Sequence, residues 1–266
     1  MKSVLALFFV AIASPAFAED YACLIEPNQV LKLAAPVQGV VQTINVDRGD
    51  RVTKGQLVAQ LDSEVEAANL QIAKLRATND TEIAANQAKL DYLSRKVSRN
   101  EKLRSSTEYV SLSQVDEAAS DARVAAAQLH ESQLNLGQAK LEAVRAEGQL
   151  HQRQIFSPVD GIVTERTLGQ GEYLNDQSHI LTIAEMNPLR IETFLPISVY
   201  GHVKIGDVAD ILPEDPVGGV YQAKVSVVDS VFDAASSTIG VRLALPNPDL
   251  ALPAGIHCHV RFKAGS

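Results

Sequence analysis

Few residues in this chain have the types and spacing that covalent or metal chemistry requires. His257 and His259 flank Cys258 in the segment IHCHVRF, and on a strand the two imidazoles would share one face. Histidine is a common metal ligand, but a structural zinc site needs four ligands, so exposed strand histidines are the simpler interpretation. The pair Gly169 and Gly171 precedes no helix pattern, which argues against a phosphate loop. Without an HExxH, CxxC or GxSxG motif, we expect no catalysis and no bound metal or cofactor.

The two cysteines, Cys23 and Cys258, are the other candidates for covalent chemistry. In an oxidising compartment they could form a disulfide that ties the start of the chain to its last strand. Sequence alone does not establish that they are close, so two unpaired cysteines, with Cys258 simply buried, remain the alternative.

Composition and charge narrow the class of protein. Apolar residues make up 46% and charged residues 21% of the 266 residues, as in globular proteins that bury a core. The net charge is −8, which excludes the basic surface that nucleic-acid binding requires.

The first eighteen residues have the features of an export signal. Lys2 precedes the apolar run VLALFFVAIA, which is too short to span a bilayer, and Ala16-Phe17-Ala18 is a cleavage pattern. We expect a signal peptide over residues 1–18 and a mature, exported chain from Glu19. An uncleaved membrane anchor and a lipid anchor on Cys23 fit these residues less well.

After the signal segment, the sequence pattern changes from that of strands to that of a helix. Residues 30–62 alternate β-branched residues with turn signals such as DRGD and TKGQ, which predict short strands. From Ser63 to about Arg104 there is neither Gly nor Pro, which predicts a long helix. Asn79 and Asn86 fall near the apolar seam of this helix. The spacing of the apolar residues shifts there, which resembles a stutter in a coiled coil. The apolar seam residues are Val65, Ala68, Ile72, Leu75, Ile83, Leu90, Leu93 and Val97.

The polar stretch SSTEYVSLS separates this helix from a second one that extends to about Gln152. Ser113 followed by Asp116 resembles a capping box at its start. Its apolar stripe comprises Val115, Ala119, Ala122, Ala126, Leu129 and Leu136. Two helices of about forty residues, joined by a short turn, should lie antiparallel and span roughly 60 Å each. A rod of that length cannot bury its seam in a globule, so we expect it to project.

Two short segments outside the helices repeat each other. APVQGVVQTINVDRGD begins at Ala35 and SPVDGIVTERTLGQGE begins at Ser157. Aligning Gly39 with Gly161, 122 residues later, also aligns Pro36 with Pro158, Val41 with Val163, Gly49 with Gly171 and Val52 with Leu174. Each copy is a half-sandwich with an exposed apolar face, so the two halves should pack together with pseudo-twofold symmetry. The helical pair is then an insertion between them.

From Asn187 to Phe262 the chain contains five or six short apolar runs separated by Pro, Gly and Asp turns. Strands of this number and length predict a small antiparallel β-barrel.

This order resembles the periplasmic adaptor family, also called membrane fusion proteins, of tripartite efflux pumps and type I secretion systems. The phrases LPISVYGHVKIGDVADI, VVDSVFDAASST and LPNPDLALPAGIHCHVRF resemble barrel segments of that family. The resemblance implies an elongated multidomain protein of mixed α and β class: a lipoyl-like β-sandwich hybrid interrupted by a long antiparallel α-helical coiled-coil hairpin, followed by a small antiparallel β-barrel. The expected parts are a signal peptide (1–18), an N-terminal strand segment (19–34), the sandwich hybrid (35–62 with 155–185), the hairpin (63–154) and the barrel (186–266).

The resemblance also implies partners. The segment RNEKLRSSTEYVSLSQVDEA is similar to the family's tip contact with an outer-membrane channel, in which Arg99, Leu103 and Ser111 take the contact roles. The gap between the Leu and the Ser is one residue longer than in the family pattern. The barrel end is expected to meet an inner-membrane transporter, in the periplasm and associated with the inner membrane. The resemblance further implies a homo-oligomeric ring of six, with polar residues on the outer hairpin faces between neighbours.

Two other functions stay open from the residues. A biotinyl or lipoyl carrier subunit would share the sandwich, but LDSEVEAA occupies the place of the carrier lysine, and Lys54 lies in a different turn. An exported coiled-coil scaffold without transport would share the hairpin. The exported substrate and the energy source of the transporter are not encoded in any motif of this sequence.

Overall fold

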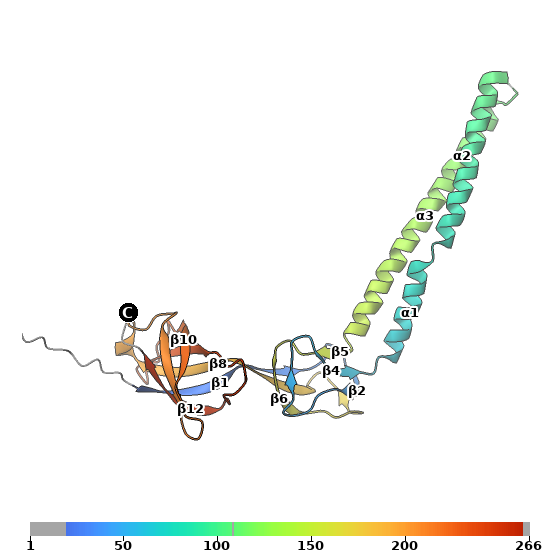
Figure 1. Cartoon of the computed structure of the whole chain (residues 1–266). Coiled ribbons are helices and arrows are strands. Elements are labelled where there is room, and N and C mark those ends of the chain that lie inside the picture. The colour runs from blue at the N-terminus through green and yellow to red at the C-terminus, as the bar shows by residue number, and fades with distance from the viewer. Residues whose placement is uncertain (1–19, 108, 263–266) are drawn as a thin grey trace, which may run out of the picture.

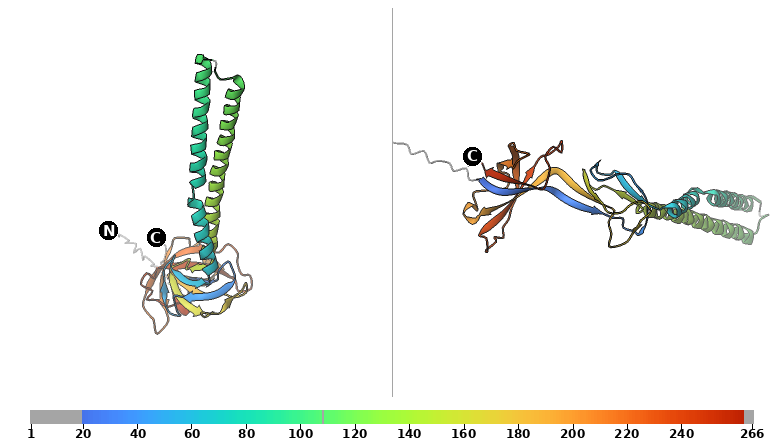
Figure 2. Two further views of the ribbon diagram at one scale, coloured as in Figure 1. Left: turned by 90° about the vertical axis from the view of Figure 1, so that its right-hand side faces the viewer. Right: turned by 90° about the horizontal axis from the view of Figure 1, so that it is seen from below.

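The computed structural model describes residues 20–107 and 109–262, and the predicted signal peptide lies outside them. Three parts follow one another in space: a β-barrel, a β-sandwich and a helical hairpin, which leaves the sandwich at the end remote from the barrel (Figure 1). Views turned by 90° show the same elongated arrangement, with the hairpin projecting obliquely (Figure 2). The mixed α and β architecture predicted from the sequence is therefore confirmed.

The barrel is a closed ring of six antiparallel strands. Closure comes from the pairing of β1 with β8, the first and last strands of the ring. Burial alternates along β11, as expected for a strand with one face toward a core. The core includes Ile25, Ile191, Ile211, Leu243 and Val260. The strands, in ring order, are β1 (Asp20–Leu33), β12 (Ile256–Phe262), β9 (Val208–Pro213), β10 (Tyr221–Val228), β11 (Thr238–Leu245) and β8 (Leu181–Pro196), and a short 3-10 helix (Ile197–Val199) follows β8.

Strands β1 and β8 continue from the barrel into the sandwich. They contain 14 and 16 residues and pair from Cys23 with Thr193 to Leu33 with Leu181. The register shifts between Pro27 and Gln29, close to the joint between the two β-domains. The two domains are thus connected by a two-stranded ribbon and not by a loop.

The sandwich contains six further strands around an apolar core that includes Val41, Val58, Leu61, Val163 and Ile183. One sheet has the order β5-β4-β2-β7, and β3 and β6 extend the sheet that contains β8. The strands are β2 (Gly39–Ile44), β3 (Arg51–Val52), β4 (Leu57–Leu61), β5 (Gln154–Phe156), β6 (Gly161–Arg166) and β7 (Tyr173–Leu174).

The two halves of the sandwich exchange strands reciprocally. Gly39 pairs with Leu174, and its counterpart Gly161 pairs with Val52, so each glycine meets the other half at equivalent positions. The hydrogen bonds repeat in the same way: the Val41 N–H donates to the Glu172 carbonyl at 2.8 Å, and the Val163 N–H donates to the Asp50 carbonyl at 2.9 Å. Each residue lies 122 positions from its counterpart, which is the offset of the sequence repeat. The predicted pseudo-twofold packing is confirmed.

A matching pair of glycines forms the turns before β3 and β7. Gly49 has φ +93° and Gly171 has φ +86°, a region that residues with a Cβ rarely adopt. The N–H of each donates to a carbonyl of the other half, Val163 and Val41 respectively, at 2.8 Å. The repeated glycines therefore place the chain for contact between the halves.

The hairpin consists of α1 (Glu64–Thr78), α2 (Thr81–Thr107) and α3 (Leu112–His151). The single helix predicted from Ser63 to Arg104 is wrong, because the chain leaves helical geometry at Asn79, with φ −85° and ψ 101°. The Asn79 side-chain oxygen accepts hydrogen bonds from the N–H and the hydroxyl of Thr81, the first residue of α2, across this break. No helix among the described residues is long and apolar enough to cross a membrane.

Candidate functional site: root and tip of the hairpin

The root of the hairpin is set by the strands on either side of it. The Leu61 N–H donates to the Arg153 carbonyl at 2.8 Å, so the chain leaves the sandwich and returns to it side by side. The Asp62 carboxylate accepts a hydrogen bond from the Glu64 N–H at 3.3 Å, at the start of α1. An acidic side chain at a helix N-terminus is favourable because the first N–H groups have no intrahelical partner.

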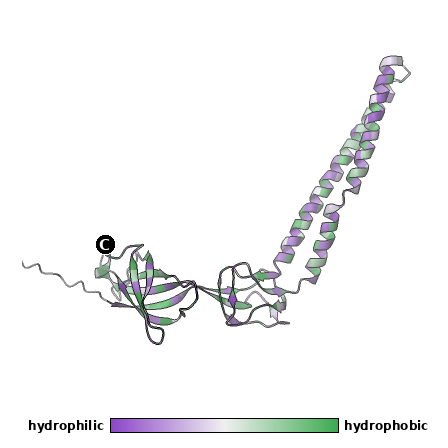
Figure 3. Ribbon diagram, in the orientation of Figure 1, coloured by the Kyte–Doolittle hydropathy of each residue, from purple (hydrophilic) through white to green (hydrophobic). Residues whose placement is uncertain are grey.

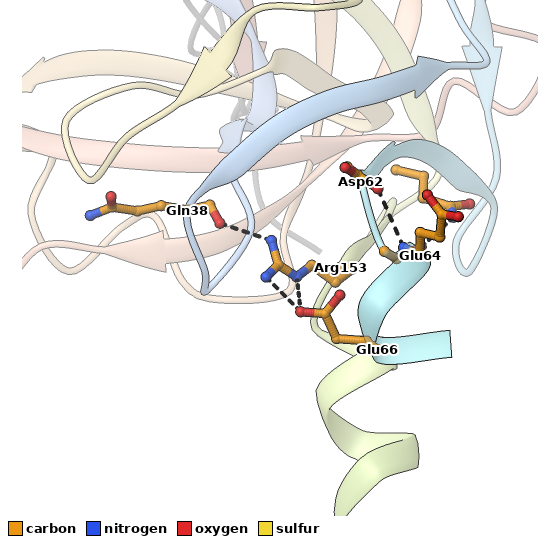
Figure 4. A network of polar contacts seen from close by, with 7 residues as sticks. Gln38, Asp62, Glu64, Glu66 and Arg153 are labelled. Carbon is orange, nitrogen blue, oxygen red and sulfur yellow. Dashed lines mark hydrogen bonds and ion pairs between the residues drawn. The ribbon is translucent and has the colours of Figure 1, made fainter. Parts of the chain in front are cut away.

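Arg153 connects three segments at this root (Figure 4). Its Nε and Nη2 donate to Glu66 Oε1 on α1 at 3.0 and 2.6 Å, and its Nη1 donates to the Gln38 carbonyl at 3.0 Å. A Cβ at Gly39 would lie 2.6 Å from Nη1, so this glycine leaves room for the guanidinium. The network ties α1, the end of α3 and the strand that begins at Gly39. The network was not predictable from the sequence, because Glu66 and Arg153 are 87 residues apart and no motif joins them.

The seam that α3 forms with α2 and then with α1 is made mainly of small side chains. On α3 it follows positions three and four apart: Ala118, Ala122, Ala125, Leu129, Ser132, Leu136, Ala139, Ala143 and Ala146. On α1 the inward residues are Ala67, Leu70, Ala73 and Ala77, of which Leu70 is buried. The predicted α3 stripe is correct at Ala122, Leu129 and Leu136 and wrong at Ala126, which is exposed.

The predicted seam of α1 is also wrong. Val65, Ile72 and Leu75 are 68%, 50% and 72% exposed and lie on the side of α1 opposite Leu70. The Arg153–Glu66 pair and the Lys74–Glu147 contact at 3.4 Å fix the rotation of α1 about its axis. Glu66 and Lys74 must both face α3 to reach their partners. The larger apolar residues then point outward. Coloured by hydropathy, the helices of the hairpin carry apolar residues, as the strands do (Figure 3).

The tip carries the three residues predicted to contact a channel. Arg99 and Leu103 lie one turn apart on α2, and both are exposed. Ser111 lies across the loop as the N-cap of α3, where its hydroxyl accepts from the Gln114 N–H at 3.3 Å and its own N–H donates to the Gln114 side chain at 3.0 Å. The predicted cap at Ser113 with Asp116 is therefore wrong by two residues. Gln114 completes the box because its amide oxygen reaches back as a Glu would.

Two apolar residues at the tip were missed by the sequence analysis. Tyr109 is 88% exposed and Leu112 is 57% exposed, beside Leu103 at 42%. The segment YVSLS contains them, but it read as a polar interruption. Exposed apolar residues at the end of a polar rod are typical of a protein contact surface.

The remaining chemical candidates lie in the β-domains. Cys23 and Cys258 are directly paired in register on β1 and β12, with Cα atoms 4.8 Å apart, and their sulfurs are bonded. His259 lies 3.9 Å from the Glu214 carboxylate. Within residues 20–107 and 109–262, no group of three or more His, Cys, Asp or Glu side chains could hold a metal ion. Lys54 lies in the turn after β3, where its backbone N–H donates to the Asp160 carboxylate at 2.8 Å.

Both β-domains match known families. The CzcB-like barrel-sandwich hybrid domain matches residues 29–185, more than half of the chain, and the CusB-like β-barrel domain matches residues 191–266. The chain is 30% identical to the macrolide export protein MacA of Escherichia coli O157:H7 over 82% of its length. It is 26% identical to the cobalt-zinc-cadmium resistance protein CzcB of Cupriavidus metallidurans, also over 82%. It spans 60% of that MacA and 39% of that CzcB.

Solved structures share the same fold. The crystal structure of MacA from Actinobacillus actinomycetemcomitans superposes with a TM-score of 0.75 at 24% identity, covering 92% of this chain and 78% of that one. The membrane fusion protein Spr0693 from Streptococcus pneumoniae R6 superposes with a TM-score of 0.63 at 14% identity, covering 93% and 100%. With both domain families matched in the order in which the fold presents them, the chain belongs to the membrane fusion proteins, the periplasmic adaptor family.

Proposed function

We propose that the protein is a non-catalytic periplasmic adaptor that joins an inner-membrane transporter to an outer-membrane channel in efflux or secretion. The observation that carries the proposal is the rod: the 40 residues of α3, paired with α1 and α2, leave the sandwich as one hairpin (Figure 1). At 1.5 Å per residue α3 is about 60 Å long. A rod with β-domains at one end and a narrow tip at the other suits a bridge between two partners.

The relatives support export as the setting. One is a macrolide export protein and another confers cobalt, zinc and cadmium resistance, so their cargoes differ in chemistry. The families that this chain matches describe a barrel-sandwich hybrid and a β-barrel and name no cargo site. We therefore propose an adaptor role without assigning a cargo.

The tip is the proposed channel contact. Arg99 and Leu103 present a charge and an apolar side chain on one face of α2, and Ser111 holds the start of α3 through its cap. Tyr109 and Leu112 extend the apolar part of this surface. Ser111 would then act on the contact mainly by fixing the loop, because its hydroxyl and N–H both bond Gln114.

The barrel end is the proposed contact with the transporter. The described chain begins at Asp20 and ends at Phe262 on this end, furthest from the hairpin tip (Figure 1). A chain exported through the predicted signal peptide would act in the periplasm at the inner membrane, as a homo-oligomeric ring of six copies. No cofactor takes part in this role.

Co-purification tests the proposal. The full chain, expressed in its own cells, is cross-linked and purified, and captured membrane proteins are identified by mass spectrometry. We expect a transporter and an outer-membrane channel, and lost export when the gene is deleted. Arg99→Asp and Leu112→Asp should lose the channel about tenfold while the transporter remains. Arg95→Asp, one turn below Arg99 and also exposed, is the matched control. Unchanged export together with capture of neither partner would refute the proposal.

A further inference from the structure

A hollow of about 660 Å³ lies at the joint between the barrel and the sandwich. Its barrel wall is the loop between β11 and β12, and its sandwich wall is formed by residues of β6 and β8. On the sandwich wall, Ile162 and Ala184 are cross-strand partners, while the next pair, Val163 and Ile183, belongs to the sandwich core. Successive side chains of a strand point to opposite faces, so the hollow lies on the outer face of this sheet.

The side chains that line the hollow are almost all apolar. Among the described residues around it, none is charged and only Thr164 has a polar side chain, whose hydroxyl already donates to the Thr182 carbonyl at 3.2 Å. Several of the others are small, among them Ala184, Ala251 and Ala254. An apolar hollow of this volume at a domain boundary is typical of a small-molecule site, since such sites measure roughly 300–1,000 Å³.

The loop that forms the barrel wall is fixed by hydrogen bonds at its start and from across the joint. The buried side-chain amide of Asn247 donates to the carbonyls of Met186 and Leu252 at 3.1 and 3.0 Å, and its oxygen accepts from the Leu252 N–H at 3.1 Å. From the sandwich, the Arg51 guanidinium donates to the Asp249 carbonyl at 3.4 Å. The hollow is therefore formed before any ligand arrives, which lowers the cost of binding.

Leu250, on the same loop, has an unfavourable backbone conformation. Its φ is +54°, in the left-handed region that residues with a bulky side chain rarely adopt. Gly or Asn would suit this backbone better, yet the chain has an apolar side chain here, and that side chain lines the hollow. Strained residues of this kind persist only where the surroundings hold them, and they cluster at ligand sites.

We propose that this hollow binds a small, uncharged apolar ligand, of which an alkyl chain is the simplest form. The walls decide the class: a charged group would lose its hydration there without gaining a charged partner, whereas each methylene group removed from water adds affinity. A bound ligand would contact the barrel loop and the sandwich sheet at the same time. The inference goes beyond the adaptor function and does not rest on it, because the site requires neither a transporter nor a channel.

Displacement of a fluorescent probe tests the site in the purified full chain. The probe is N-phenyl-1-naphthylamine, an uncharged molecule whose emission rises in apolar surroundings, and 1-octanol and 1-decanol are the competitors. We expect saturable binding of the probe at a single site. Decanol should displace it at about tenfold lower concentration than octanol, because each of its two additional methylene groups increases affinity about fourfold.

Two variants and a matched control locate the probe. Ala251→Trp places an indole in the hollow from an exposed loop position, and Leu250→Asn suits the positive φ but makes the wall polar. Both should weaken probe binding about tenfold or more. Ile205→Trp adds the same indole at a site that is 70% exposed, between the 3-10 helix and β9 and outside the hollow, and should bind the probe like the wild type.

The results separate this site from other apolar surfaces and from the adaptor function. Equal probe affinity in Ala251→Trp and Ile205→Trp would place the probe elsewhere and overturn the proposal, as would equal displacement by octanol and decanol. Ala251 is exposed, so its variant should fold like the wild type and decides the test even if Leu250→Asn does not fold. Failure to capture a transporter or a channel would remove the adaptor function and leave this site standing.

Discussion

The network at the hairpin root is open to a double-mutant cycle. Arg153→Met keeps the length of the side chain and removes the guanidinium, and Glu66→Gln keeps the shape and removes the charge. The reference state has two hydrogen bonds from Arg153 to Glu66, at 3.0 and 2.6 Å, and one to the Gln38 carbonyl at 3.0 Å. The two single variants and the double variant together isolate the pairwise term.

The expected loss of stability follows from the burial of the two side chains. A hydrogen bond to a charged group contributes about 1.5–3 kcal/mol net, and breaking a fully buried ion pair costs about 3–5 kcal/mol. The side chains of Arg153 and Glu66 are 23% and 20% exposed, so solvent screens the pair in part. We expect Arg153→Met to lower the free energy of unfolding by about 2–3 kcal/mol and the coupling energy to be about 1.5 kcal/mol. Arg153→Lys should not restore stability, because one ammonium cannot serve both Glu66 and Gln38.

Urea unfolding followed by circular dichroism at the helix band measures the stability of each variant. Spin labels on the tip and on the barrel measure the hairpin angle, and we expect a broader distance distribution in Arg153→Met. A coupling energy below about 0.5 kcal/mol would place the pair with screened surface ion pairs. The strands β4 and β5 would then have to hold the hairpin alone, and the reasoning about the root would fail.

Three further predictions have defined outcomes. Gly161→Ala should cost about 2–4 kcal/mol because its Cβ would lie 2.5 Å from a backbone carbonyl, whereas Gly137→Ala on α3 should not destabilise because its Cβ would meet nothing within 4 Å; equal urea midpoints would contradict this. Cys258→Ser should lower stability by about 3 kcal/mol, and reductant should lower the wild type equally but leave the variant unchanged in thermal melts. Hydrogen bonds from Arg261 hold the pKa of Asp20 below its ordinary value, so this stabilisation is present above that value and disappears as pH falls through the lowered pKa. Melting temperatures of Asp20→Asn should therefore fall less steeply than those of the wild type below about pH 4.

The sandwich was predictable because the repeated residues are ones that the fold requires, either for their backbone conformation or for their burial. Gly49 and Gly171 must adopt positive φ, and Val41 and Val163 must be buried, so one offset aligned them all. Contacts between the halves are a direct consequence of that alignment. Length and composition were likewise enough to predict a projecting hairpin, since two helical stretches of some forty residues each form a rod that is too long to enter a globular core.

The orientation of α1 was not predictable from periodicity. The helix has two apolar faces, and the larger residues Val65, Ile72 and Leu75 suggested the wrong one. The inward face is Ala67, Leu70, Ala73 and Ala77, chosen by ion pairs whose partners are remote in sequence. The break at Asn79, which is the C-cap of α1, was noticed only as a drift in phase. The root network and the apolar tip were missed because each depends on neighbours brought together by the fold.

The ribbon formed by β1 and β8 limits how this protein can be divided. A cut between the matched domain families would fall inside β8, between residues 185 and 191, and would leave the first half of β1 without its hydrogen-bonding neighbour. Exchanging either β-domain for that of a relative thus means recutting two strands in matching register. The same pair of uninterrupted backbones resists stretching, since extended chain has no slack to give, while it can still twist. Tension applied to the barrel would therefore reach the sandwich through hydrogen-bonded backbone.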